Sequence, residues 1–143
     1  MSKQSIAILD TGILCIFLSS NPTPSVTLLM EKIMKGEIHA KMPKPMIVET
    51  FFHICTTDGK EKAQISIMNL LKHYPIELIE FNSSLLLAAG VLKCQHRTHL
   101  SYNDCMGIAL ALDMKANFHT TEKQLKEIPN NVLKRLKMVS YTF

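Results

Sequence analysis

Ser5-Ile-Ala-Ile-Leu9 is a short apolar run that ends at Asp10, and a helical pattern follows directly from Thr11. A buried strand that leads straight into a helix is typical of α/β domains with a parallel sheet. The same alternation of short β-like runs with longer helical patterns continues to the end of the chain. Further strands are expected at residues 38–42, 76–81, 117–119 and 137–141.

Helix signals fill the intervals between these strands. Pro45 suits a first helical turn, because its missing N–H has no partner there in any case. Ser83 and Ser101 are good N-cap residues, and Thr57-Asp-Gly59 is a turn. Helices are therefore expected at residues 11–18, 23–36, 43–55, 60–74, 83–95, 101–115 and 120–126. The pattern predicts one domain over residues 1–143, a three-layer α/β/α sandwich with a mostly parallel sheet of about five strands.

Composition narrows the class of protein. The chain has 143 residues, 47% of them apolar, and a net charge of +4. We expect a cytoplasmic, soluble protein, because there is no signal-peptide pattern and no apolar stretch long enough to span a membrane. The four cysteines lack CxxC spacing and are expected to be free thiols. The slight excess of positive charge is compatible with a nucleic-acid substrate.

Acidic residues occupy comparable places in this pattern. Asp10 ends the first strand, and Glu49 lies on the helix after the second strand. Asp104 lies in the first turn of the helix that Ser101 opens, and Glu122 follows the strand at 117–119. Because function in such sheets gathers at the carboxyl ends of the strands, we expect these side chains to converge there.

Each acid also has a purely structural explanation. Asp10 could cap the helix that follows it. Ser101-Tyr-Asn-Asp104 matches a capping box, so Asp104 could bond only the backbone. Glu122 could complement a helix dipole. Glu49 lies off the apolar stripe at positions 47, 48, 51, 52 and 55, and could be a solvated residue.

Taken together, the four acids indicate a metal site. Carboxylates brought within a few ångströms repel one another, and burial raises their pKa values further. A divalent cation makes such a cluster tolerable, and Mg²⁺ and Mn²⁺ prefer carboxylate and water oxygens. A metal held in this way activates water and stabilises charge on a phosphodiester.

The same segments resemble those of PIN-domain nucleases, in particular the VapC-type toxins of prokaryotic toxin–antitoxin pairs. Ile8-Leu-Asp-Thr11 is similar to the opening motif of the family, and Pro45-Met-Ile-Val-Glu49 to its Glu-bearing segment. Leu100-Ser-Tyr-Asn-Asp104 resembles the Asp-bearing helix, and Phe118-His-Thr-Thr-Glu122 the closing strand segment. The resemblance covers essentially the whole chain.

This resemblance implies a Mg²⁺- or Mn²⁺-dependent endoribonuclease, a hydrolase of RNA phosphodiester bonds. Asp10, Glu49, Asp104 and Glu122 would be the metal ligands, and the Thr11 hydroxyl would orient Asp10 or a metal-bound water. A homodimer and a cognate antitoxin are implied as well. Two positions depart from the family, since Gly12 replaces the commoner Ser or Asn and Glu122 replaces Asp.

Other readings of the sequence remain open. A PIN-type fold could bind RNA or a protein without cutting, and Glu122 in place of Asp favours that alternative. Asp10-Thr-Gly12 also matches the aspartic protease motif, although those enzymes are nearly all β. Cys94, His96, His99 and Cys105 could form a zinc site, although their spacing fits no common zinc pattern. Lys44 and Lys123 lie beside the acids in sequence and could touch a phosphate.

Overall fold

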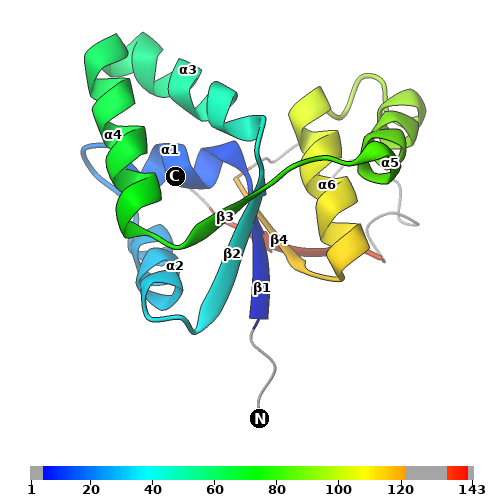
Figure 1. Ribbon diagram of the computed structural model, residues 1–143, viewed down its shortest axis with the longest axis horizontal. Helices are drawn as coiled ribbons and strands as arrows, with labels where there is room; N and C mark the ends of the chain where they lie inside the picture. The colour runs from blue at the N-terminus through cyan, green and yellow to red at the C-terminus, as the bar shows by residue number, and fades with distance from the viewer. Residues whose placement is uncertain (1–4, 122–134, 142–143) are drawn as a thin grey trace.

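Five parallel strands form the centre of the molecule (Figure 1). The computed structural model describes residues 5–121 and 135–141. The strands are β1 (Ser5–Leu9), β2 (Ile38–Pro43), β3 (Ile76–Ile79), β4 (Asn117–Thr120) and β5 (Lys137–Ser140). The helices within the described residues are α1 (Thr11–Phe17), α2 (Pro24–Met34), α3 (Met46–Asp58), α4 (Lys60–His73), α5 (Ser83–Gln95) and α6 (Tyr102–Met114). The expected α/β fold with a five-stranded parallel sheet is confirmed.

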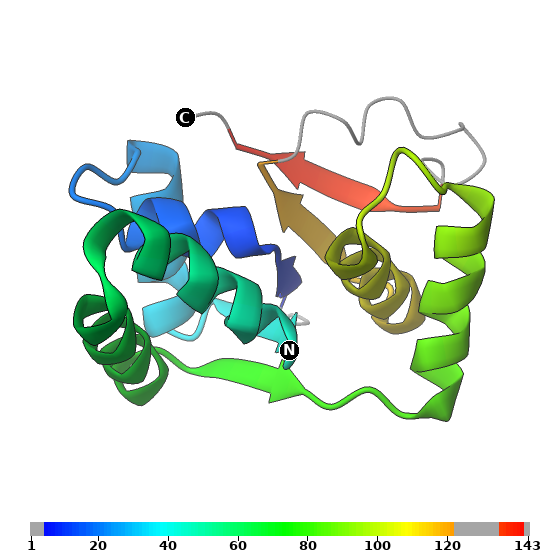
Figure 2. The same ribbon diagram turned by 90° about the horizontal axis from the view of Figure 1, so that it is seen from above.

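The strand order explains where a site can form. It is β3-β2-β1-β4-β5, so the chain starts at the middle of the sheet, grows outward through β2 and β3, and returns to add β4 and β5. Because crossovers between parallel strands are right-handed, the two directions of growth place their helices on opposite faces. Figure 2 shows this arrangement, with α1 to α4 on one face and α5 and α6 on the other. Strand order reverses between β1 and β4, whose carboxyl ends frame a crevice.

The side chains of β1 alternate between two apolar clusters, as expected for a strand that is covered on both faces. Ala7 and Leu9 pack with residues of α1 and α2. Ile8 packs on the opposite face with residues of α5 and α6. All three side chains are fully buried. The central strand is thereby fixed in register, which also fixes the position of the residue that follows it, Asp10.

Short polar side chains and one glycine define the helix ends. Asp10 caps α1, and Ser101 caps α6 in a complete capping box. Helix α5 is capped by Asn82, which accepts the Leu85 N–H at 2.9 Å, so the prediction that Ser83 is the N-cap is wrong by one position. Gly59 has a φ of +92° and separates α3 from α4, a conformation that side-chain-bearing residues rarely adopt.

Several predicted boundaries differ from the observed ones. Helix α3 continues to Asp58 and β3 stops at Ile79. Thr120 ends β4 and does not open a helix, while the rest of the helix predicted at 120–126 lies outside the described residues beyond Thr121. No helix in the described part of the chain is both long and apolar enough to cross a membrane.

The apolar stripe expected on α3 is only in part its buried face, because Ile47, Phe51 and Cys55 pack against an apolar cluster but Val48 and Phe52 do not. Met46, Thr50 and Ile54 are the buried residues of this helix, whereas Val48 is 73% and Phe52 59% exposed. Because α3 also packs against α4 and α1, its contacts do not follow the simple apolar stripe in the sequence. Glu49 lies on the side of α3 that faces α1, where its carboxylate accepts the Thr11 hydroxyl at 3.3 Å.

Helix α6 approaches β4 closely at Gly107. A Cβ atom at this position would lie 2.6 Å from Cε1 and 3.0 Å from Cζ of Phe118. The Phe118 ring is fully buried in the cluster between the sheet and α6, so it has little room to move. Because Gly107 has no side chain, α6 can pack this closely against the sheet.

We expect Gly107→Ala to lower the free energy of unfolding by about 1–3 kcal/mol, because overpacking outweighs the roughly 1 kcal/mol that alanine contributes to a helix. Gly90→Ala on α5 is the matched control, since a Cβ there meets nothing within 4 Å. It should stabilise the protein by about 0.5–1 kcal/mol. Urea denaturation of both variants measures the difference, and equal stabilisation by the two substitutions would contradict this account.

Candidate functional site

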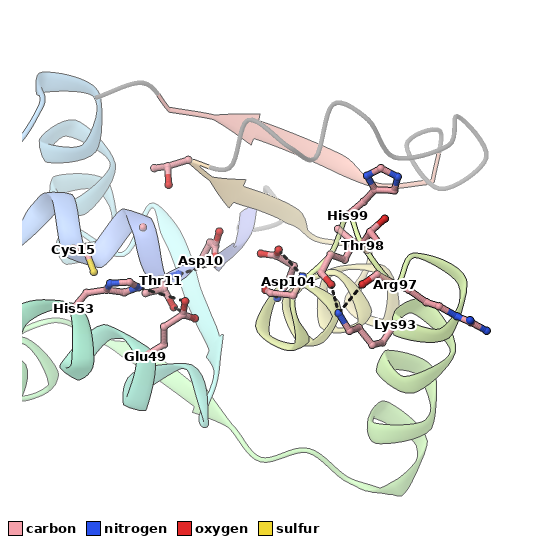
Figure 3. A pocket seen from close by; sticks show the side chains of 14 residues that line it. Asp10, Thr11, Cys15, Glu49, His53, Lys93, Arg97, Thr98, His99 and Asp104 are labelled. Atoms are coloured by element: carbon pink, nitrogen blue, oxygen red, sulfur yellow. Dashed lines mark hydrogen bonds and ion pairs between the residues drawn. The ribbon is translucent and has the colours of Figure 1, made fainter.

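A cavity of about 630 Å³ lies where the carboxyl ends of β1 and β4 meet the two helical layers. Figure 3 shows Asp10, Thr11, Glu49 and His53 on one side of it and Asp104 with the α5–α6 connection on the other. The described residues that line it are Asp10, Thr11, Gly12, Cys15, Glu49, His53, Lys93, Arg97, Thr98, His99, Leu100, Ser101, Asp104 and Thr121. The cavity therefore occupies the position that the strand order favours.

Asp10 is the most deeply placed acid of the cavity. It is 4% exposed, and its backbone N–H donates to the His119 carbonyl at 3.0 Å. One carboxylate oxygen, Oδ1, accepts the Thr11 N–H at 2.8 Å, and the other, Oδ2, accepts the Thr120 hydroxyl at 2.8 Å. Donors on both oxygens offset the cost of burying a carboxylate. Its orientation is set by α1 on one side and by β4 on the other.

Glu49 is held by donors from three helices. The Thr11 hydroxyl donates to Oε2 at 3.3 Å, and the Asn103 amide donates to the same oxygen. The His53 ring, one turn further along α3, lies 3.4 Å from Oε1. The glutamate side chain thus reaches toward the cavity from α3 while α1 and α6 contact its carboxylate.

Asp104 faces the cavity from the other helical layer. It is 8% exposed; one carboxylate oxygen accepts the Ser101 N–H at 3.1 Å, while its own N–H donates to the Ser101 hydroxyl at 3.0 Å. Burial raises the pKa of this carboxyl and the Glu49 charge raises it further, whereas the Ser101 hydrogen bonds and the Lys93 charge lower it. The negative charge of Glu49 thus acts on Asp104 from across the cavity.

The pKa of the Cys15 thiol also reflects the negative charge of these acids. Its pKa is raised to about 11, first by burial and then by the charges of Glu49 and Asp10. Cys15 is therefore a protonated thiol near neutral pH and a poor nucleophile. The acids of the cavity disfavour further negative charge in this region and favour a cation.

The basic side of the cavity is formed by the end of α5 and the loop after it. Lys93 donates to the Leu100 carbonyl at 2.7 Å and the Arg97 carbonyl at 3.1 Å, and its ammonium lies 4.9 Å from the centre of the Tyr102 ring. These contacts hold the loop that leads into α6. Lys93 is therefore fixed at the wall, near Asp104.

The predicted site residues Asp10, Thr11, Glu49 and Asp104 all line this one cavity. Glu122 and Lys123 lie outside the described residues. Lys44 does not reach the cavity, because it forms an ion pair with Glu80 at 3.0 Å beside a different groove. Its closeness to Glu49 in the sequence therefore did not indicate a place in the site.

Sequence reasoning missed five residues that contact the acids or form the basic wall. Thr120 contacts Asp10, and Asn103 and His53 contact Glu49. Lys93 and Arg97 line the basic wall. The i, i+4 spacing of Lys93 and Arg97 just before Ser101 was the available signal for the wall. Nothing local could identify Asn103 as the partner of a glutamate 54 positions away.

The donor set suits a hard divalent cation, because it consists of carboxylate and hydroxyl oxygens. Within residues 5–121 and 135–141, no three His, Cys, Asp or Glu side chains stand so that they could hold one ion between them. Mg²⁺ does not need such a cage, since it keeps several waters and is bound by one or two carboxylates together with substrate phosphates. The residues present fit an ion held in that way.

The competing readings find less support. The parallel α/β sheet is not the nearly all-β fold of aspartic proteases. Cys105 is buried in the core between the sheet and α6, whereas Cys94 is exposed, and they share no metal-ligand group among the described residues. The fold therefore does not support an aspartic protease, and the placement of the cysteines does not support the Cys/His zinc site.

Comparisons with solved structures show the same fold. VapBC2 from Rickettsia felis, bound to a promoter DNA fragment, matches with a TM-score of 0.73 and 19% identity over 95% of this chain and 98% of that one. DNA-bound VapBC from Salmonella typhimurium matches with a TM-score of 0.70 and 12% identity over 95% and 98%. VapC20 from Mycobacterium tuberculosis, described as a sarcin–ricin loop cleaving toxin, matches with a TM-score of 0.62 and 12% identity over 78% and 86%.

A comparison with curated protein sequences finds no significant match. The family comparison is more informative, because the PIN domain family matches residues 7–131. That match includes the last three residues of β1, both acid-bearing helices and β4, which contribute to the cavity. The chain therefore belongs to the PIN domain family.

Proposed function

We propose that this protein is a Mg²⁺- or Mn²⁺-dependent endoribonuclease that hydrolyses RNA phosphodiester bonds at the cavity between the helical layers. One observation carries the proposal. Carboxylates from three separate segments, Asp10, Glu49 and Asp104, line a single cavity at the strand-order reversal of a PIN domain. Carboxylates that share a cavity repel one another, and a bound cation would relieve this repulsion, so the arrangement indicates a binding role.

The chain's own groups prepare the cavity for this reaction. Asp10, Glu49 and Asp104, with Glu122 as a further proposed ligand, would hold the ion, either directly or through the waters that Mg²⁺ keeps. The ion would activate a water molecule and stabilise charge that develops on the phosphodiester. Thr120 and the Thr11 N–H fix the direction of the Asp10 carboxylate, and the Thr11 hydroxyl contacts Glu49. Carboxylates fixed in this way need little reorganisation when the substrate binds.

The proposal extends to the proteins with which this chain would assemble. The similar structures from Rickettsia felis and Salmonella typhimurium are VapBC complexes with DNA, and another is a toxin–antitoxin complex from Klebsiella pneumoniae. We propose that this chain is the toxin of such a pair, with a cognate antitoxin. The resemblance to VapC-type toxins also supports a homodimer and a cytoplasmic location. Identification of a small DNA-binding protein encoded beside it would support the toxin role.

A second candidate is a PIN-fold module that binds RNA or a protein without cutting. Two observations favour it. No three potential ligands in the described part of the chain converge on one ion, and Glu122 stands where the family has Asp. The cleavage experiment below separates the two candidates, because only the nuclease depends on the charge of Asp10.

We expect purified protein with Mn²⁺ to cleave RNA, and Asp10→Asn to lower kcat/KM by at least about 100-fold, because even outer-shell changes at metal sites cost 10–100-fold. Asn is as good an N-cap as Asp, so α1 should still form. Asp113→Asn, on the exposed face of α6, is the control and should retain activity. Equal cleavage by wild type and Asp10→Asn would indicate contamination; RNA binding without cleavage by either would favour the binding module.

A metal-dependent change in stability is the second expected result. Mn²⁺ at tenfold above its Kd should raise the melting temperature by about 3–6 °C, because an ion that binds only the folded state stabilises it. Asp104→Asn should lose most of this increase, although an Asn side chain can still accept the Ser101 N–H and keep the cap. Asp113→Asn should keep it. A melting temperature that Mn²⁺ leaves unchanged in the wild type would contradict the metal site.

A further inference from the structure

Asn103 connects the two helical layers beside the cavity. It lies in the first turn of α6, beside Asp104, and its amide donates to Oε2 of Glu49 on α3. Helices α3 and α6 cover opposite faces of the sheet (Figure 2), so this hydrogen bond passes over the carboxyl edge of the strands. It joins the two walls that carry the acids.

The other contacts of Glu49 are too long to fix it by themselves. The Thr11 hydroxyl is 3.3 Å from Oε2, beyond the usual 2.5–3.0 Å range for hydroxyl donors, and the His53 ring is 3.4 Å from Oε1. The glutamate is about a third exposed, and its long side chain has considerable rotamer freedom to lose. The Asn103 amide is therefore the main donor that selects one orientation of Glu49.

The type of donor also matters for a cation site. A lysine or arginine at position 103 would hold the glutamate but would add a positive charge and repel a metal ion. An amide provides an N–H without net charge, so it orients the carboxylate and leaves its negative charge available. Thr11 and Ser101 contact the acids in the same uncharged manner.

We propose that Asn103 is a positioning residue that fixes the Glu49 carboxylate at the cavity and thereby sets the affinity of the site for Mg²⁺ or Mn²⁺. This inference rests on the proposed metal-dependent function. It assigns a role to a residue that lies within the Leu100–Asp104 segment but is not one of the acids, and to which the sequence patterns assigned no function.

The test is Mn²⁺ binding to the purified protein without RNA, measured by calorimetric titration. We expect Asn103→Ala to weaken Mn²⁺ binding by about 10-fold, the usual effect of removing an outer-shell partner of a metal ligand. Asn69→Ala, the same change at an exposed position of α4, should leave the affinity unchanged. Asn103→Ser, which suits the start of a helix, repeats the test with a second side chain too short to reach Glu49.

A double-mutant cycle shows whether Asn103 acts through Glu49. In a Glu49→Gln background, Asn103→Ala should cause no further loss of Mn²⁺ affinity, because the carboxylate that it positions is gone. Equal losses of Mn²⁺ affinity in the two backgrounds would overturn the proposal. It would also be overturned if Asn103→Ala bound RNA more weakly in EDTA but kept its Mn²⁺ affinity, because Asn103 would then contact RNA directly.

The outcomes also separate this inference from the proposed function. A wild-type protein that binds no Mn²⁺ would overturn both. If Asn103→Ala and Asn103→Ser bind Mn²⁺ as tightly as the wild type does, only the role of Asn103 is overturned. The metal site would then remain supported. If the Asn103 variants melt at a lower temperature but bind Mn²⁺ with unchanged affinity, the proposal is overturned and Asn103 has a purely structural role.

Discussion

The burial of the Asp10 carboxylate at the end of the central strand is the constraint on which the site depends. The flanking residues of β1 lock its position, because Ala7 and Leu9 pack on one face of the sheet and Ile8 on the other. A carboxylate so placed needs donors on both oxygens, and the Thr11 N–H and the Thr120 hydroxyl provide them. Strand β4 must therefore lie beside β1, and the site can form only after both halves of the sheet have assembled.

The other acids are oriented by uncharged groups. The contacts of Glu49 include a hydroxyl and an amide, and Asp104 shares a capping box with Ser101. Donors of this kind reduce the cost of burial and leave the negative charge largely in place. The raised pKa values of Asp104 and Cys15 reflect burial together with that remaining charge. A cavity with this electrostatic character is suited to bind a cation together with a phosphate.

Sequence alone predicted the layers of the fold and the three acids that line the cavity, because both depend on local pattern. Apolar runs ended by an acid locate strand ends, and strand ends in a parallel sheet share one edge. Contacts between distant segments were not predictable in this way. Thr120 was assigned to the start of a helix, although it ends β4 and contacts Asp10. Lys44 was judged by its nearness to Glu49 in sequence, but it pairs with Glu80.

The structural and the functional explanations of the acids, which competed in the sequence, turn out to be compatible. Asp10 is the N-cap of α1, Glu49 lies in the first turn of α3, and Asp104 lies in the first turn of α6. Each carboxylate thus sits at the positive end of a helix dipole, which stabilises its charge. Three helix N-termini around one cavity make close carboxylates tolerable before any ion binds. Capping fixes the Asp10 and Asp104 side chains, so a feature that appeared to argue against a site instead helps one to form.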